Sequence, residues 1–273
     1  MYRLFHTIRI FPISNQVYNI ITILLQSSAV SAVFKVSTLN RLPYANNLTG
    51  VPFGATLYPR GKVMTRYQKI FKDIKETSDY KTVGEDIDYK IIIDDERREV
   101  ILQFEESDSR QDWKHNLMFI PWILNLDGHK VLTTHGYACA YKSAKNIPLQ
   151  ELCIALNQHG GYDPVIRGWS FGSAMAKIAV RHFWYRRYTK VKEQNTYGDV
   201  KVWLNPFTHF LAKKWCCKIM EFVCINDFVT WQVPFYHRTN KKRVGGRFSF
   251  KRIFNTEYEH THYEQFDYSE YEN

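Results

Sequence analysis

The stretch Gly168-Trp-Ser-Phe-Gly172 decides the fold of this chain. It matches the pattern G-x-S-x-G, in which a serine sits on a strained turn between a strand and a helix. Residues 162–167 before it are typical of a short strand. Residues 171–188 after it are an uninterrupted helical stretch with apolar side chains every three or four positions. Strand, sharp turn and helix are the context that this pattern requires, so we predict a nucleophile elbow with Ser170 at its tip.

Length and composition indicate a packed globular protein of one large domain, or at most two small ones. The chain has 273 residues, of which 45% are hydrophobic and 16% aromatic. Its cysteines are odd in number and include no C-x-x-C pair, so we expect free buried thiols and no metal site. They are Cys139, Cys153, Cys216, Cys217 and Cys224.

The net charge of +10 is distributed unevenly. Residues 1–63 hold six of the 37 Lys and Arg side chains and none of the 27 Asp and Glu, so the remaining chain carries only +4. Because residues 64–273 carry nearly equal numbers of basic and acidic side chains, nucleic acid is not expected to be a main partner. The local cluster Arg238–Arg243 is interpreted as a solvated loop.

The change in composition near residue 63 divides the chain into an N-terminal segment, 1–63, and a working domain, 64–273. The segment fits a targeting peptide, either a transit peptide or a signal peptide with residues 20–25 as its apolar run, or a disordered tail. It also fits a spurious upstream extension before Met64, which we slightly favour. Residues 18–34 are interrupted by polar side chains and are short for a membrane span. No localisation follows from the sequence.

The domain that follows Met64 alternates between helices and strands. We expect an amphipathic helix at 65–78 and a second helical segment at 138–159 with a break at Pro148. Besides the strand of the elbow, the expected strands lie at 89–93, 99–104, 130–134, 200–204 and 220–225. Strands separated by helices predict an α/β fold with a mostly parallel central sheet and helices on both faces.

From Glu99 onward the chain resembles the class 3 lipases, a branch of the α/β-hydrolases. The resemblance rests on four motifs in the family's order, and the elbow is the strongest of them. The other three are Asp112-Trp113-x-x-Asn116-Leu117, His135-Gly136-Tyr137, and Asn226-Asp227-Phe228-Val229. The resemblance implies an α/β-hydrolase fold and a serine hydrolase that cleaves carboxylic esters, with lipids or acylglycerols as substrates. It implies no cofactor and no metal.

A serine hydroxyl needs an adjacent base, and the base needs an orienting carboxylate. In this fold the order along the chain is serine, acid, histidine, which gives Ser170 as the nucleophile and Asp227 as the acid. Asp199 is a rival acid that we exclude because it begins an expected strand and so lies at the wrong edge. The motif His260-Thr-His-Tyr263 resembles the family's H-x-x-Y pattern and selects His260 as the base, with His262 as the alternative.

The oxyanion hole requires two donors. The first is the backbone N–H of Phe171, which follows the nucleophile. By resemblance, the second is Ser107, although Glu106 beside it replaces the family's glycine and adds negative charge. The family's lid corresponds here to residues 118–126, which we expect to contact a lipid interface.

Two further kinds of function remain compatible with the sequence. One is a short-chain esterase, a phospholipase or an amidase, since the sequence does not define the acyl or leaving group. The second is a catalytically inactive α/β-hydrolase that serves as a binding module, a hypothesis motivated by Glu106 and by the choice between two histidines. The oligomeric state is not indicated.

Overall fold

The computed structural model describes residues 63–105, 118, 120–205, 207–231, 236–245, 248 and 256–272. All of them belong to the second of two compact units into which the chain divides, residues 52–273. The predicted segment 1–63 falls outside the described residues except for its last position, and the boundary at residue 64 stays a prediction.

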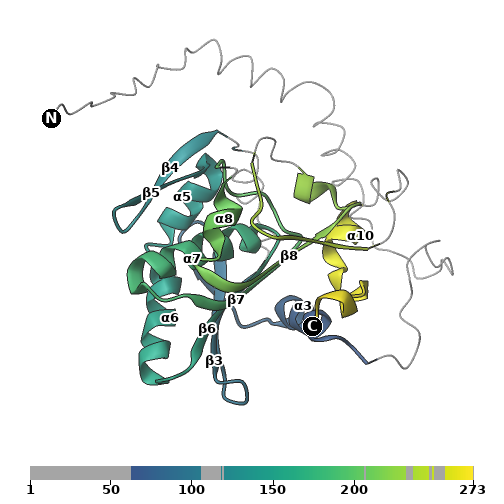
Figure 1. Ribbon diagram of the computed structural model, residues 1–273, viewed down its shortest axis with the longest axis horizontal. Coiled ribbons are helices and arrows are strands. Elements are labelled where there is room, and N and C mark those ends of the chain that lie inside the picture. Colours follow the sequence, from purple (N-terminus) through teal and green to yellow (C-terminus); the bar gives the residue numbers. More distant parts are fainter. Residues whose placement is uncertain are drawn as a thin grey trace, which may run out of the picture. The chain divides into compact units, whose positions relative to one another are not determined.

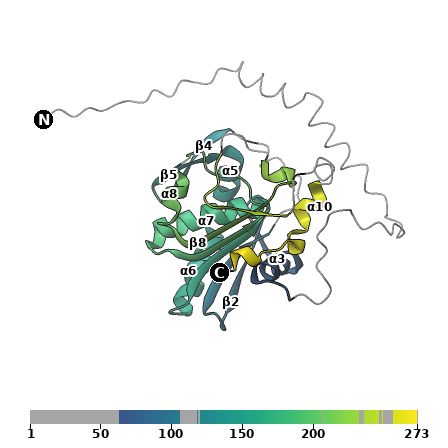
Figure 2. The same cartoon turned by 45° about the vertical axis from the view of Figure 1, so that its right-hand side comes forward.

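A seven-stranded sheet forms the centre of this unit, as Figures 1 and 2 show. Its strands are β1 (Lys81–Val83), β2 (Ile87–Asp94), β3 (Glu99–Phe104), β6 (Asp163–Trp169), β7 (Val191–Tyr197), β8 (Cys216–Cys224) and β9 (Lys241–Val244). They lie in the order β1-β2-β3-β6-β7-β8-β9. The five strands from β3 to β9 are mutually parallel, whereas β1 and β2 pair antiparallel. The predicted mostly parallel sheet is confirmed.

Helices cover both faces of the sheet (Figures 1 and 2). The α-helices are α3 (Arg66–Glu76), α5 (His135–Ser143), α6 (Ile147–Gln158), α7 (Phe171–Arg187), α8 (Thr208–Ala212) and α10 (Thr256–Thr261). Helices α5, α6 and α7 share one hydrophobic cluster with β3, and α3 shares a second with the C-terminal segment. Each cluster excludes water from one face of the sheet, which is the main stabilisation of such a layered fold.

The first helix begins where its sequence indicates. Thr65 caps α3 through a reciprocal arrangement, in which its hydroxyl accepts from the Gln68 N–H and the Gln68 side chain accepts from the Thr65 N–H. The apolar face of the helix, Tyr67, Ile70, Phe71 and Ile74, is buried against the sheet. The structure therefore confirms the predicted amphipathic helix, shortened by one residue at its start and two at its end.

The predicted break in the second helical segment is also present. Helix α5 ends at Ser143, and Lys145 and Asn146 adopt left-handed backbone conformations with φ of 49° and 62°. Pro148 then lies in the first turn of α6, where its missing N–H has no helical partner to lose.

One predicted strand is wrong. Residues 200–204 are irregular apart from a single bridge between Trp203 and His237, and the strand at this point of the sheet is β7. Sequence reasoning missed β7 because its centre, residues 193–195, is polar yet buried. Its buried Glu193 is hydrogen-bonded by Arg66 and Tyr67 of α3 at 3.2 and 3.0 Å. Partners distant in sequence thus compensate a charge that no local pattern explains.

A separate two-stranded sheet follows the segment after β3. It pairs β4 (Pro121–Leu126) antiparallel with β5 (His129–Thr134). The turn between them places Asp127 beside α7, where Arg186 binds it with two hydrogen bonds of 2.8 and 3.1 Å. The stretch expected to act as a lid is therefore, in its described part, the first strand of a hairpin tied to α7.

Candidate active site

The elbow places Ser170 at the point where β6 ends and α7 begins. Its backbone has φ of 53° and ψ of −121°, a region that residues with a side chain rarely occupy. Such a conformation costs about 1–3 kcal/mol and persists only where the surroundings enforce it. The turn therefore holds the Ser170 side chain at the carboxyl edge of the sheet, as the motif predicts.

The two glycines of the motif allow close backbone approach. A Cβ atom at Gly168 would lie 2.2 Å from the carbonyl oxygen of Gly172. A Cβ atom at Gly172 would lie 2.5 Å from the carbonyl oxygen of Glu105. Both distances are too short for any side chain, so the glycines are required for packing as well as for the turn.

The structure brings Ser170, His260 and Asp227 into one hydrogen-bonded chain. His260 Nε2 lies 2.7 Å from Ser170 Oγ, and His260 Nδ1 lies 2.6 Å from Asp227 Oδ2. A carboxylate can only accept, so Nδ1 carries the proton and Nε2 accepts from the serine hydroxyl. All three side chains are buried. This arrangement can take a proton from Ser170 as the oxygen attacks an electrophile.

Asp227 is held from two further sides. It lies just beyond the end of β8, where its Oδ1 accepts from the Val229 N–H at 3.0 Å and its Oδ2 accepts from the Tyr263 hydroxyl at 2.9 Å. Burial, followed by the nearby Asp227 charge, raises the pKa of Tyr263 well above its ordinary value. The Tyr263 hydroxyl therefore stays protonated and donates to the carboxylate.

His260 depends on contacts that sequence reasoning missed. The Trp169 indole N–H donates to the His260 carbonyl at 3.1 Å. Gly198 has φ of +53°, and a Cβ atom there would lie 2.6 Å from His260 Cε1. A glycine directly after a strand is the sequence signal for Gly198, but the predicted strands do not include β7.

His262, the alternative base, is directed elsewhere. Its Nδ1 lies 3.0 Å from the Tyr258 carbonyl oxygen, and its ring stacks on that of Tyr258 with centroids 4.1 Å apart. The hydrogen bond to Ser170 is made by His260.

The predicted position of Asp199 at the wrong edge of the sheet is itself wrong. Asp199 follows β7 at the carboxyl edge of the sheet, the edge where a catalytic acid belongs. Its carboxylate is instead bound by Lys177 at 2.7 Å and by Arg238 at 3.0 Å. These contacts, and not its position in a strand, set it apart from Asp227.

Of the two predicted oxyanion donors, one lies in the described region. Phe171 is the first residue of α7, so its N–H is at the positive end of the helix dipole and next to the nucleophile. Ser107, together with Glu106, lies outside the described residues.

Known proteins share both the sequence pattern and the fold. The family model described as "Lipase (class 3)" matches residues 101–237, half of the chain. The chain belongs to the class 3 lipase family. Family membership makes it a carboxylic ester hydrolase with an α/β-hydrolase fold. A search of the curated proteins gave no match.

Several solved lipase structures share this fold. A fungal lipase–inhibitor complex has a TM-score of 0.53 and 18% identity, over 64% of this chain and 68% of that one. The Rhizomucor miehei lipase–propeptide complex has a TM-score of 0.53 and 15% identity, over 73% and 78%. A triacylglycerol lipase described as having a serine protease triad has a TM-score of 0.51 and 18% identity, over 60% and 63%.

The β4–β5 hairpin of this class 3 lipase exposes apolar side chains. Trp122 and Ile123 are each 49% exposed and Leu132 is 43% exposed, whereas Leu124 and Leu126 are buried. The outward apolar side chains are compatible with the expected lipid contact of residues 118–126, which stays a prediction.

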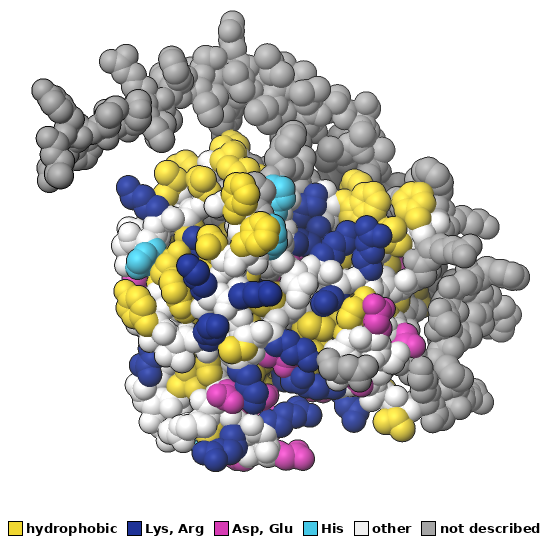
Figure 3. Space-filling view, in the orientation of Figure 1, with side chains coloured by type: hydrophobic (Ala, Val, Ile, Leu, Met, Phe, Trp, Pro, Cys, Tyr) yellow, Lys and Arg dark blue, Asp and Glu magenta, His cyan; other side chains and the backbone are white. Residues whose placement is uncertain are grey.

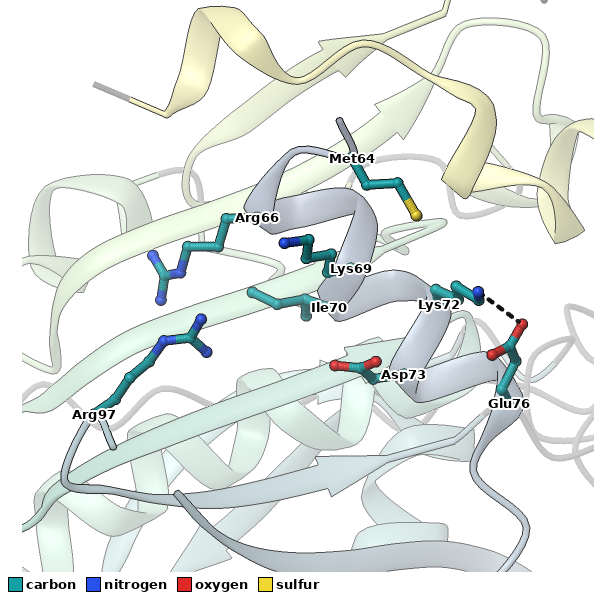
Figure 4. Close-up of a pocket in the computed structure, with 8 residues that line it drawn as sticks. All are labelled: Met64, Arg66, Lys69, Ile70, Lys72, Asp73, Glu76 and Arg97. Carbon is teal, nitrogen blue, oxygen red and sulfur yellow. Dashed lines mark ion pairs between the residues drawn. The ribbon is translucent and has the colours of Figure 1, made fainter. Parts of the chain in front are cut away.

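A pocket of about 350 Å³ lies away from these residues, between α3 and the turn that joins β2 to β3. Its lining is mostly charged: Met64, Arg66, Lys69, Ile70, Lys72, Asp73, Glu76 and Arg97. In Figure 4, Arg66 and Arg97 extend toward each other across the pocket, and Lys72 pairs with Glu76. No predicted site residue lines this pocket, and its charges do not suit an acyl chain.

In the part that the structure describes, no group of three or more His, Cys, Asp or Glu side chains is arranged to hold a metal ion. No helix there is long and apolar enough to cross a membrane. All five cysteines are free thiols, but only Cys216 and Cys224 are buried as expected; Cys139 and Cys153 are half-buried and Cys217 is exposed.

Proposed function

We propose that this protein hydrolyses carboxylic esters of acylglycerols through an acyl-enzyme on Ser170, with His260 as the general base and Asp227 as the orienting acid. One observation carries the proposal: the continuous hydrogen bonds from Ser170 through His260 to Asp227, beside an enforced elbow. The family to which the chain belongs supports the same reaction.

The first half of the reaction transfers the acyl group to the protein. Ser170 Oγ attacks the ester carbonyl carbon while His260 Nε2 takes the hydroxyl proton. The carbonyl oxygen becomes an oxyanion, toward which the Phe171 N–H donates a hydrogen bond. When the tetrahedral intermediate collapses, the C–O bond to the alcohol breaks, and the alcohol leaves with the proton from His260 Nε2.

The second half returns the protein to its starting state. A water molecule gives a proton to His260 Nε2 and attacks the acyl carbon of the ester on Ser170. The second tetrahedral intermediate collapses to a carboxylic acid, and Ser170 Oγ recovers the proton from His260. Asp227 accepts the hydrogen bond from His260 Nδ1 throughout and stabilises the imidazolium that forms twice in each cycle.

A serine-reactive fluorophosphonate probe tests the nucleophile. The wild-type chain is expected to become labelled, and Ser170→Ala is expected to lose the label. Ser173→Ala, three residues further along, is a matched control that keeps Ser170. An unlabelled wild type, or equal labelling of Ser170→Ala, would falsify the proposal and favour the inactive binding module.

The acylglycerol substrate is the finer part of the proposal. It is supported by family membership, by the exposed apolar hairpin, and by a structural neighbour described as a triacylglycerol lipase. Hydrolysis of nitrophenyl esters of increasing acyl length tests it, with a long-chain preference as the expected result. A preference for the shortest ester indicates a short-chain esterase. Cleavage of phospholipids in preference to acylglycerols indicates a phospholipase, and cleavage of amides indicates an amidase.

A further inference from the structure

The basic cluster Arg238–Arg243 is not a simple solvated loop. Its last three residues begin β9, the edge strand of the central sheet. Side chains alternate along a strand, and here Lys242 and Val244 turn toward the C-terminal segment, with the Lys242 ammonium over the Tyr271 ring. Lys241 and Arg243 are exposed on the opposite side of the strand.

Further positive charge lies next to these two side chains. Partial desolvation, and then the charges of Arg238, Arg243 and Lys201, lower the pKa of Lys241. Burial and the Arg238 charge likewise lower the pKa of Lys201. Arg238 is bound to Asp199 and Lys201 is half-buried, whereas Lys241 and Arg243 are exposed. Like charges held this close repel one another, which favours an anionic partner.

Exposed aromatic side chains adjoin the cations. Phe228 and Trp231 belong to the short 3-10 helix η1 (Phe228–Trp231) and are 46% and 45% exposed. Phe248 is 42% exposed, and its ring stacks on that of Trp231 with centroids 6.3 Å apart. The Arg238 guanidinium donates to the Thr230 carbonyl, which connects η1 to the basic strand.

Cations and aromatic rings therefore share one face. In the upper right of Figure 3, Lys and Arg side chains lie beside hydrophobic ones. Basic side chains attract anionic lipid headgroups, and Trp and Phe insert at the boundary between headgroups and acyl chains. Lysines also discourage pairing of an exposed edge strand, but that role does not require neighbouring exposed aromatics.

We propose that this basic-aromatic face, formed by Lys201, Lys241, Arg243, Phe228, Trp231 and Phe248, docks the protein onto an anionic phospholipid surface. Phe228 directly follows Asp227 in the chain, so docking here holds the proposed site beside the lipid. The inference goes beyond the proposed hydrolysis, because binding through this face needs no chemistry at Ser170.

Vesicle sedimentation tests the face without hydrolysis. The full chain carrying Ser170→Ala is mixed with phosphatidylcholine vesicles that contain or lack phosphatidylglycerol, and it is expected to bind the anionic vesicles preferentially. Adding Lys241→Glu and Arg243→Glu is expected to weaken that binding at least about 25-fold, since each basic side chain near an anionic leaflet is worth about fivefold in affinity. Trp231→Ala is expected to weaken it severalfold.

The charge-matched control is Lys142→Glu with Lys190→Glu. Both lysines are exposed, and Lys142 lies in α5, which packs next to β1 at the far edge of the sheet. This control is expected to bind as the parent does. In a chain with Ser170 intact, the Lys241/Arg243 substitutions are expected to leave hydrolysis of a soluble nitrophenyl ester unchanged, which shows that the fold is intact.

Three results would overturn the inference. Equal binding to both kinds of vesicle shows that the protein does not prefer anionic lipid. Unchanged binding after the charges at Lys241 and Arg243 are reversed shows that this face does not bind the vesicles. Displacement from anionic vesicles by a DNA duplex that the protein binds more tightly indicates a nucleic-acid surface instead. Each result is independent of whether Ser170 hydrolyses esters.

Discussion

At the scale of single residues, the geometry around Ser170 depends on side chains that do no chemistry themselves. Tyr263 and the Val229 N–H hold the two oxygens of Asp227, and Trp169 holds the His260 backbone. A displacement of about 1 Å in such a site can cost about 100-fold in rate. These positioning contacts therefore give the sharpest tests of the proposed roles.

Tyr263→Phe removes one hydroxyl and keeps the buried ring. A hydrogen bond to a charged group contributes about 1.5–3 kcal/mol, so we expect kcat to fall about tenfold or more with KM within about twofold. Steady-state hydrolysis of a soluble ester measures both constants. Tyr162→Phe, whose exposed hydroxyl bonds Asp95, is the control. An unchanged kcat contradicts a positioning role for Tyr263.

Gly198→Ala tests the space that His260 requires. The added methyl group would meet the imidazole at 2.6 Å, so we expect kcat to fall about 10- to 100-fold because the ring must move. Gly128→Ala is matched in backbone strain, since φ there is +89°, but no atom lies within 4 Å of its Cβ position. It is expected to keep full activity. Equal kcat values for the two variants rule out a steric role for Gly198.

At the scale of elements, local patterns predicted the helices well and one central strand badly. The apolar spacing and capping signals of α3 are local, and the structure reproduces them. Strand β7 carries Glu193, Gln194 and Asn195 inside the sheet, a run that is typical of solvent-exposed chain. The misplacement of that strand then produced the wrong reason for excluding Asp199.

Thr65→Ala tests the start of α3. Loss of an N-cap hydroxyl costs about 1 kcal/mol, so we expect the free energy of unfolding to fall by about that amount. Denaturant unfolding measures it, with Thr82→Ala on the exposed part of β1 as the control. The hydroxyl has no capping role if the two variants unfold at the same midpoint.

At the scale of the whole molecule, a buried histidine connects elements that are distant in sequence. His182 of α7 lies 3.0 Å from both the Tyr141 hydroxyl of α5 and the Asp127 carboxylate of the β4–β5 turn. Burial lowers the pKa of His182 below its ordinary value of 6.5 and outweighs the opposing effect of Asp127. Just below pH 6.5 the native protein therefore keeps this histidine neutral, whereas the unfolded chain binds a proton at the same side chain.

This buried histidine makes the stability of the fold depend on pH. Below about pH 6.5 the unfolded chain gains a proton at His182 that the native state resists, so stability is expected to fall as the pH drops through this value. Urea unfolding at about pH 7.5 and about pH 5.5 measures the loss. His182→Gln is expected to lose less stability between the two pH values than the wild type. An equal loss contradicts this account; His209→Gln on the exposed side of α8 is the control.

The sequence by itself determined the α/β class, the elbow at Ser170, helix α3 and the break before α6. These features follow from short-range spacing of apolar, glycine and proline residues, which is visible within a dozen positions. The sequence favoured His260 and Asp227, but tertiary structure decided between His260 and His262, what separates Asp199 from Asp227, and that a polar segment forms β7. Those outcomes depend on contacts between residues far apart in the chain, such as Lys177 with Asp199 and Arg66 with Glu193. Long-range pairing of buried charges leaves no periodic trace in a single sequence.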